Sequence, residues 1–241
     1  MGNAKSKQEE VVYEISLDDW PWLWAIWDSE CLDWKRGLDD DEIQETALRQ
    51  AKLPVPIITD SLYVGNAFSV SSIETLKDNG ITAVLNMAGP MALKRKTIQA
   101  YRNNGIQYKR IDGLDEDDYP LLQKHWLEAS DFITFTTKNG GKCVVHCVAG
   151  RNRSVLIVAA YYMLSKRTNV LETVQHVRKQ RGNIALWNEG FQAQLVALAR
   201  KHDLLGPAPG TDGSIVTKIP PPSNSITPQH WALAKLSDRE I

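Results

Sequence analysis

One stretch of this chain decides its fold, Val144-Val145-His146-Cys147-Val148-Ala149-Gly150-Arg151-Asn152-Arg153-Ser154. A short apolar run ends in a histidine and a cysteine, and a loop with one glycine and two arginines follows. The serine opens a second apolar run, Val155 to Leu164, which has the character of a buried helix. Backbone amides at the start of a helix form an anion site, and a guanidinium matches the oxygens of a phosphate. We therefore predict a strand, a phosphate-binding loop and a helix in direct succession.

Cys147 lies at the floor of the predicted loop. The loop amides and Arg153 create a positive field that favours the thiolate, which is the nucleophilic form of cysteine. Attack of this thiolate on phosphorus would give a phosphocysteine intermediate. The planar fork of Arg153 would hold two phosphoryl oxygens and stabilise the transition state. A cysteine that merely fills the core would not account for the glycine and the arginines at fixed spacing.

The backbone amides of the loop are predicted to surround the phosphate, as in other anion-binding nests. Gly150 is expected to adopt a positive φ so that the loop can curl round the anion. The predicted phosphate-binding residues are Val148, Ala149, Gly150, Arg151, Asn152 and Arg153.

These residues resemble the His-Cys-x5-Arg-Ser/Thr signature of the cysteine-based protein tyrosine phosphatases. The wider match, over about residues 56–203, is to the dual-specificity group: Ile57–Asn66 is similar to its entry strand and Asn188–Leu195 to its closing helix. The resemblance implies an α/β fold with a central mixed, mostly parallel sheet and helices on both faces. It also implies a thiol-phosphate mechanism without a metal or other cofactor.

Three supporting roles are expected around the nucleophile. The resemblance implies that Ser154 assists breakdown of the phosphoenzyme; a serine at the start of a helix is also a typical N-cap, and both roles are compatible. It further implies that Asn188 braces the phosphate loop, whereas the alternative is a plain helix cap. His146 is expected to orient the loop by hydrogen bonding, because a thiolate attacks without a base. No matching ligand set accompanies His146, so no metal site is expected.

The departing alkoxide or phenoxide needs a proton, which calls for a general acid on a separate loop. Asp115 is the predicted acid: it lies 32 residues before Cys147 and directly after a predicted strand. Its position and separation are similar to those of the family's acid loop, and the same residue would later activate the hydrolytic water. Asp117 and Asp118 remain alternatives, because an acidic run is also typical of a solvated loop.

Strand and helix signals alternate from position 57 onward, which predicts an α/β sheet with helices packed on it. Ligand sites in such sheets lie beyond the carboxyl ends of the strands, where Cys147 falls. Strands are expected over residues 57–64, 81–86, 106–111 and 142–146, and helices over 71–79, 94–103, 120–137, 153–166, 170–181 and 189–202.

Composition divides the chain into three segments. Residues 1–53 carry 6 Lys/Arg against 13 Asp/Glu and are rich in tryptophan. Residues 54–205 carry 19 Lys/Arg against 13 Asp/Glu, and this basic segment, which suits an anionic substrate, is the predicted catalytic domain. Residues 206–241 contain six of the eleven prolines and are expected to form a disordered tail.

The amino terminus, Met1-Gly2-Asn3-Ala4-Lys5-Ser6, fits the pattern for N-myristoylation of Gly2. A single myristoyl chain binds a membrane only marginally, so a second contact would be needed. Trp20, Leu23, Trp24, Trp27, Cys31 and Trp34 recur at helical spacing. This stripe would suit a lipid interface, but the acidic residues around it disfavour anionic lipid. We therefore predict that the stripe packs on the phosphatase domain or on a partner.

Three cysteines and no secretory signal predict a reducing, cytoplasmic setting, with membrane association through Gly2. A disulfide between Cys143 and Cys147 is not expected, because an extended strand would separate the two by about 13 Å. Cys143 is expected to pack in the core.

The resemblance implies a protein phosphatase that hydrolyses phosphotyrosine and phosphoserine/threonine. Arg151 adds a second cation at the rim of the loop, as in lipid-directed relatives, so a phosphoinositide or other non-protein phosphatase is the alternative. A third reading, an inactive phospho-binding module, conflicts with the presence of Cys147, Arg153 and Asp115. The expected partners are a phosphorylated protein, a membrane surface and a phosphoinositide. Nucleic acid is not expected, because no basic patch is interleaved with aromatic residues.

Overall fold

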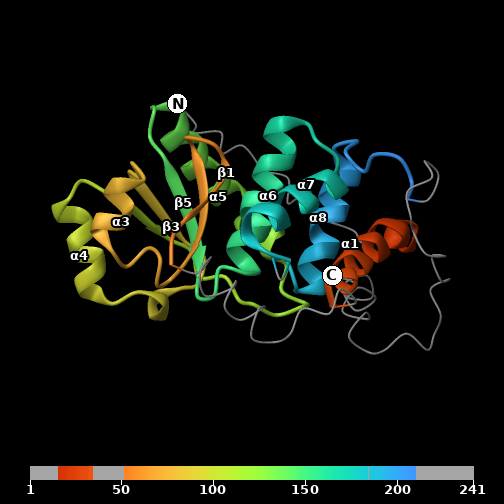
Figure 1. The fold of residues 1–241 in the computed structure, drawn as a ribbon, viewed down its shortest axis with the longest axis horizontal. Coiled ribbons are helices and arrows are strands. Elements are labelled where there is room, and N and C mark those ends of the chain that lie inside the picture. The colour runs from red at the N-terminus through yellow and green to blue at the C-terminus, as the bar shows by residue number, and fades with distance from the viewer. Residues whose placement is uncertain (1–15, 35–51, 184, 210–241) are drawn as a thin grey trace, which may run out of the picture.

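A computed structural model describes residues 16–34, 52–183 and 185–209 of the chain (Figure 1). Gly2 and most of the predicted tail, residues 210–241, lie outside these ranges.

The centre of the molecule is a five-stranded sheet with the order β1-β2-β5-β3-β4. Strands β2, β5, β3 and β4 run parallel, and β1 is antiparallel to β2. The predicted mixed, mostly parallel sheet is therefore confirmed, and β5 lies in its middle. The strands are β1 (Val55–Ile58), β2 (Leu62–Asn66), β3 (Ala83–Asn86), β4 (Gln107–Arg110) and β5 (Cys143–Cys147).

The single strand expected over residues 57–64 is wrong, because this region forms the β1–β2 hairpin. Its turn is closed by a hydrogen bond from Ser61 N to the carbonyl oxygen of Ile58, at 3.1 Å. Asp60 has φ +62, a left-handed conformation that aspartate tolerates better than most residues. The flanking apolar residues concealed this turn in the sequence.

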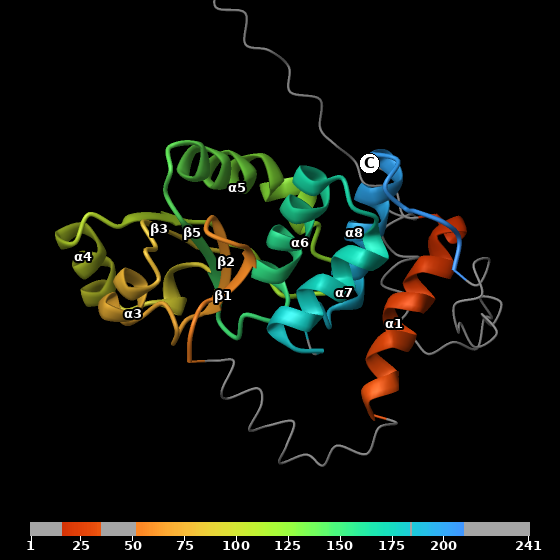
Figure 2. The same cartoon turned by 45° about the horizontal axis from the view of Figure 1, so that its top comes forward.

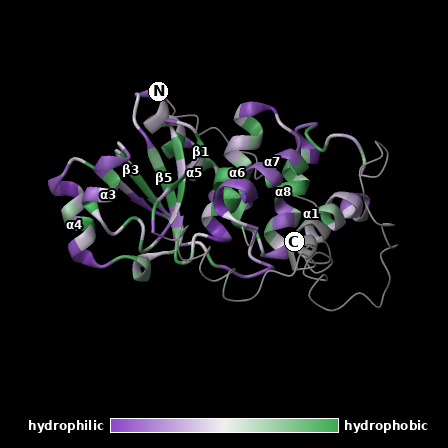
Figure 3. Cartoon of the chain, in the orientation of Figure 1, coloured by the Kyte–Doolittle hydropathy of each residue, from purple (hydrophilic) through white to green (hydrophobic). Residues whose placement is uncertain are grey.

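Helices cover both faces of the sheet, as predicted (Figure 1). Side chains alternate along β5: Val144 belongs to a core with α3 and α4, whereas Val145 belongs to a larger core with α5 to α8. Figure 3 shows the hydrophobic residues running along the strands in the middle of the molecule. The helices of these two layers are α3 (Ile73–Asp78), α4 (Arg95–Asn103), α5 (Leu121–Lys138), α6 (Arg153–Lys166), α7 (Val170–Arg181) and α8 (Glu189–Lys201), with a short 3₁₀ turn η2 (Pro90–Ala92).

A further helix, α1 (Trp20–Trp34), follows the short turn η1 (Leu17–Asp19) and lies against α7 and α8 (Figure 2). Its buried side chains include Leu23 and Ile26, which join the larger core. The predicted packing of the stripe on the phosphatase domain is thus confirmed in part: Trp20 and Leu23 are buried, Trp24 and Trp27 are only half-buried, and the side chains of Cys31 and Trp34 lie outside the described part of the chain. Ile26, which is not in the stripe, is buried in the core, whereas Trp27 packs against Trp24 with tilted rings whose centroids are 4.8 Å apart.

One polar contact anchors α1, and another anchors the preceding turn η1, to the helices beneath them. Arg178 of α7 donates from Nη1 to the carbonyl oxygen of Ile26 at 2.8 Å. Asp19, which is buried, pairs through Oδ2 with Nη2 of Arg200 at 3.3 Å. No described helix combines the length and the apolar character that crossing a bilayer requires.

Candidate active site

Cys147 ends β5 at the carboxyl edge of the parallel strands, and its side chain is buried. Its sulfur accepts two hydrogen bonds, from the backbone N–H of Gly150 at 3.2 Å and from Oγ of Ser154 at 3.3 Å. Both donors are directed at the sulfur, where they can stabilise negative charge when the sulfur acts as a leaving group. The loop therefore holds this thiol where a phosphoryl group can be attacked.

The loop reverses direction at Gly150, which has φ +68, so the predicted positive φ is confirmed. A Cβ at this position would lie 2.5 Å from the carbonyl oxygen of Gly65 and 2.7 Å from Nη2 of Arg181. These contacts exclude any side chain, and a glycine is required both for the turn and for the close approach of β2.

Arg153 begins α6 and reaches across to the loop that follows β4. Its Nη1 donates to the carbonyl oxygen of Gly113 at 3.1 Å, and its Nε lies 3.5 Å from Oδ2 of Asp115. Only 12% of the Arg153 side chain is exposed, so this partly desolvated cation interacts strongly with a nearby anion. The guanidinium thus connects the phosphate loop to the predicted acid.

Asp115 is held from two sides, since its Oδ1 also lies 3.5 Å from Nδ2 of Asn188, the amide that donates to it. The structure therefore brings Arg153 and Asp115 together beside the loop that begins at Cys147, although the three residues come from different elements. Burial raises the pKa of Asp117, with smaller contributions from the charges of Asp115 and Asp118. Asp117 accordingly stays the alternative acid.

Comparisons with known proteins identify the family of the domain that holds this site. The family model described as "Dual specificity phosphatase, catalytic domain" matches residues 62–201, more than half of the chain. The chain belongs to this family. The match excludes α1, which precedes it in the sequence.

Individual members of the family show the same similarity. Dual specificity protein phosphatase 26 of Homo sapiens is 36% identical over 141 residues, which cover 58% of this chain and 64% of the relative. The Protein phosphatase Slingshot homolog of Xenopus laevis is 30% identical over 203 residues, covering 81% of this chain and 28% of the relative. The chain thus spans a little less than two thirds of the first of these phosphatases.

Solved structures agree with the fold. The crystal structure of DUSP15 aligns with a TM-score of 0.53 at 29% identity and covers 64% of this chain and 93% of its own. A mouse putative dual specificity phosphatase, complexed with zinc tungstate, aligns with a TM-score of 0.54 at 26% identity, covering 62% and 88%.

Asn188 of this dual-specificity phosphatase domain combines the two roles considered for it. Its Oδ1 accepts the N–H of Phe191 at 2.9 Å and so caps α8. Its own backbone N–H donates to Oδ1 of Asn152 in the phosphate loop at 3.1 Å. Because its Nδ2 faces Asp115, one residue joins the helix cap, the phosphate loop and the acid loop.

His146 is fully buried beneath the loop, and burial lowers its pKa to about 4. The ring is therefore neutral at pH 7, and its Nδ1 contacts the carbonyl oxygen of Cys147 at 3.2 Å, a contact in which Nδ1–H donates. Nε2 has no hydrogen-bond partner in the described part of the chain. This geometry fits a supporting role for His146 in holding the loop.

Arg181 braces the phosphate loop from below, and the sequence analysis did not single it out. Its Nε donates to the carbonyl oxygen of Gly150 at 3.0 Å and its Nη2 to that of Ala149 at 3.3 Å. With these carbonyls held beneath the loop, its amides are free to face an anion. Burial lowers the pKa of Arg181, and the neighbouring Cys147 opposes that shift. The sequence signal was weak, because basic residues in the last turn of a helix are usually solvated.

Cys143 and Cys147 are both free thiols. Cys143 is buried in the larger core, and burial raises its pKa, so it is an inert packing residue at neutral pH. Within the described ranges, no three His, Cys, Asp or Glu side chains gather closely enough to hold a metal ion.

Proposed function

We propose that this protein is a dual-specificity protein phosphatase that hydrolyses phosphotyrosine and phosphoserine/threonine through a cysteinyl-phosphate intermediate. The observation that carries the proposal is the sulfur of Cys147, which accepts hydrogen bonds from Gly150 N and Ser154 Oγ. Arg153 and Asp115 complete the set of groups that the reaction needs. Membership of the dual-specificity phosphatase family supports the same chemistry.

The first step transfers the phosphoryl group to the enzyme. The thiolate of Cys147 attacks phosphorus in line with the leaving oxygen, and the bond from phosphorus to that oxygen breaks as the S–P bond forms. Arg153 and the loop amides hold the three remaining oxygens and stabilise the charge of the transition state. Asp115 gives its proton to the departing alkoxide or phenoxide, a contribution commonly of about 10²- to 10⁴-fold.

The second step frees the enzyme. A water molecule attacks phosphorus, and the carboxylate of Asp115 takes one of its protons. The S–P bond breaks, inorganic phosphate forms, and the electron pair returns to the sulfur of Cys147. Gly150 N and Ser154 Oγ, both within 3.3 Å of this sulfur, stabilise it as a leaving group.

The test is phosphate release by the full chain from phosphotyrosine, phosphoserine and phosphothreonine peptides and from phosphoinositides, with Cys147→Ser as control. We expect turnover of the peptides, a phosphate adduct on Cys147 after rapid acid quench, and no turnover by the variant. Hydrolysis of phosphoinositides alone would reject the protein-phosphatase assignment. Residual activity in Cys147→Ser would reject the cysteinyl-phosphate route.

One observation favours a second candidate, a phosphatase for phosphoinositides. Arg151 is exposed at the rim of the loop, where a second phosphate group on the same substrate could pair with it. The substrate panel separates the two candidates, and Arg151→Ala sharpens the answer. A loss confined to lipid substrates would assign Arg151 to a lipid headgroup.

We further propose that Gly2 carries a myristoyl group and that the protein works in the cytoplasm, in part at membrane surfaces. The amino-terminal sequence pattern supports this proposal. Mass spectrometry of the amino-terminal peptide from eukaryotic cells should show the acyl group, and Gly2→Ala should shift the protein to the soluble fraction. An unmodified Gly2 in such cells would refute the proposal.

A further inference from the structure

Large apolar side chains are exposed around the mouth of the candidate active site. Phe68 follows β2 and is 72% exposed, Leu114 follows β4 and is 49% exposed, and Val148 follows β5 and is 55% exposed. Trp187, directly before the cap of α8, is 52% exposed. We call these four residues the apolar rim. Single exposed apolar residues need no explanation, but a group of them around one polar loop marks an interaction site.

Backbone hydrogen bonds place two members of the apolar rim at the same edge of the phosphate loop. Val148 is the first loop residue after Cys147, and its carbonyl oxygen accepts the N–H of Ala67 at 3.1 Å. Phe68 is the next residue along the chain, so its side chain projects beside the loop.

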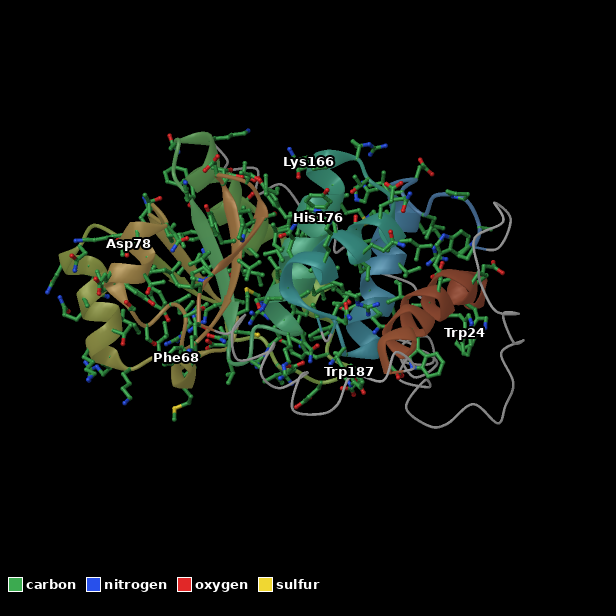
Figure 4. The ribbon with its side chains drawn as sticks, viewed as in Figure 1. Trp24, Phe68, Asp78, Lys166, His176 and Trp187 are labelled. Atoms are coloured by element: carbon green, nitrogen blue, oxygen red, sulfur yellow. The ribbon has the colours of Figure 1, made fainter. Side chains whose placement is uncertain are left out.

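The other two members are tied to the loop from its opposite end. Leu114 follows Gly113, whose carbonyl oxygen accepts Nη1 of Arg153 at 3.1 Å. The N–H of Trp187 donates directly to Oδ1 of Asn152 at 2.9 Å. Figure 4 shows Phe68 and Trp187 both on the lower edge of the molecule, well apart from each other and away from His176 and Lys166. The segments that carry the apolar rim are therefore tied to both ends of the phosphate loop.

We infer that the apolar rim binds apolar side chains that flank the phosphorylated residue of a protein substrate; this inference rests on the proposed function. A phosphoryl group held by the loop brings its neighbouring residues over the rim, because extended peptide residues are spaced about 3.3 Å apart. Exposed aromatic side chains are the residues that most often carry binding energy at protein interfaces.

Charge favours a peptide over a membrane as the occupant. Glu116 and Asp117 are exposed on the same loop as Leu114, beside the apolar rim, and these two carboxylates outnumber the one exposed cation of the phosphate loop, Arg151. Their carboxylates would be repelled by the anionic lipids that accompany phosphoinositides. A peptide avoids this repulsion, since it can place apolar side chains on Trp187 and Phe68 and keep acidic residues away from the acid loop.

The test compares phosphotyrosine peptides that differ only in the residues next to the phosphotyrosine, leucine or phenylalanine in one set and serine in the other. With the full chain, we expect kcat/KM to be about tenfold higher for the apolar set, mainly through KM. Trp187→Ala and Phe68→Ala should each bring this ratio close to one. Phe135→Ala is the matched control: Phe135 is 60% exposed, near the end of α5 that leads to the amino end of β5, and the ratio should keep its wild-type value.

Three results would overturn the inference. The wild-type ratio could be close to one, or both rim variants could keep the wild-type preference. Thirdly, a phosphoinositide in phosphatidylcholine vesicles could be hydrolysed faster than every peptide, and Trp187→Ala could lower this rate. That result would assign the apolar rim to membrane binding. Failure of the proposed function gives a different result: a small aryl phosphate is hydrolysed, but no phosphopeptide is dephosphorylated. That result would refute the inference about the apolar rim as well.

Discussion

The phosphate loop and helix α1 both rest on an arginine of α7, and the two arginines lie about one helical turn apart. Arg181 donates to carbonyl oxygens of Ala149 and Gly150 in the loop. Arg178 donates to the carbonyl oxygens of Ala185 and, in α1, of Ile26. The loop arranges polar atoms around the position where a phosphate would bind, whereas α1 contributes mostly buried apolar surface to the core. One helix therefore supports a site of chemistry and a site of packing, and substitutions should separate activity from stability.

The largest effect is expected in the loop. Cys147→Ser removes the nucleophile but almost no volume, so kcat should fall on the order of 10⁴-fold or more while the free energy of unfolding stays near the wild-type value. Steady-state kinetics and denaturant titration measure the two quantities. A large loss of stability in this variant would show that the loop and the core are not separable.

Asp115→Asn should lower kcat by about 10²- to 10⁴-fold for substrates with poor leaving groups. The loss should shrink for a nitrophenyl ester, because a good leaving group needs less protonation. Asp117→Asn is the matched control and should have a much smaller effect. If the two variants exchange these results, Asp117 is the acid and the assignment from geometry fails.

Ile26→Ala should have the opposite effect to Cys147→Ser, because it should lower stability and leave activity nearly unchanged. Ile26 is 1% exposed in the core beneath α1, so truncation should lower the free energy of unfolding by about 2–5 kcal/mol. The kcat of the folded fraction should change little, because α1 lies away from Cys147. An unaltered stability would mean that α1 adds nothing to the fold in solution, and a selective fall in kcat would connect α1 to the chemistry.

The pH dependence of stability should come in part from His146. Its pKa falls from 6.5 to about 4 on burial, so the folded state excludes a proton that the unfolded chain accepts. The contribution of His146 to the free energy of unfolding is complete above pH 6.5. It should decrease by about 3 kcal/mol as the pH falls toward 4. Unfolding titrations across this range should show a shallower slope for His146→Asn, and an identical slope would contradict the burial of the neutral ring.

The smallest effect is expected at Asp19. Burial raises the pKa of this carboxyl, a shift that its hydrogen bond from Ser16 and the charge of Arg200 only partly offset. The charged form is therefore disfavoured in the folded protein. Stability from this group should rise as the pH falls through its folded pKa, and this contribution should be complete below the unfolded value of 3.8. Because the Arg200 side chain is 36% exposed and stays solvated without its partner, Asp19→Asn should change the free energy of unfolding at neutral pH by less than about 1 kcal/mol. A larger destabilisation would show that the ion pair with Arg200 outweighs the cost of burial.

Much of the fold follows from local patterns. The six predicted helices of the catalytic segment are present with shifts of a few residues, and Asn169 and Asn188 cap α7 and α8 through their side chains. The β1–β2 hairpin was missed because its turn lies inside an apolar run. Arg181 was missed because its burial depends on α7 packing beneath the phosphate loop.

The sequence by itself determined the local chemistry of the site. Cys147, Gly150 and Ser154 lie within 7 residues of one another, so the succession of strand, loop and helix already brings both hydrogen-bond donors to the sulfur. Tertiary structure decided the partners that come from elsewhere. Asp115 meets Asn188 across 73 residues, and Arg178 reaches Ile26 across 152. Contacts over such separations depend on how the helices pack on the sheet. Hydrophobic burial drives that packing, and because it is not directional, the sequence does not show which polar residues will meet.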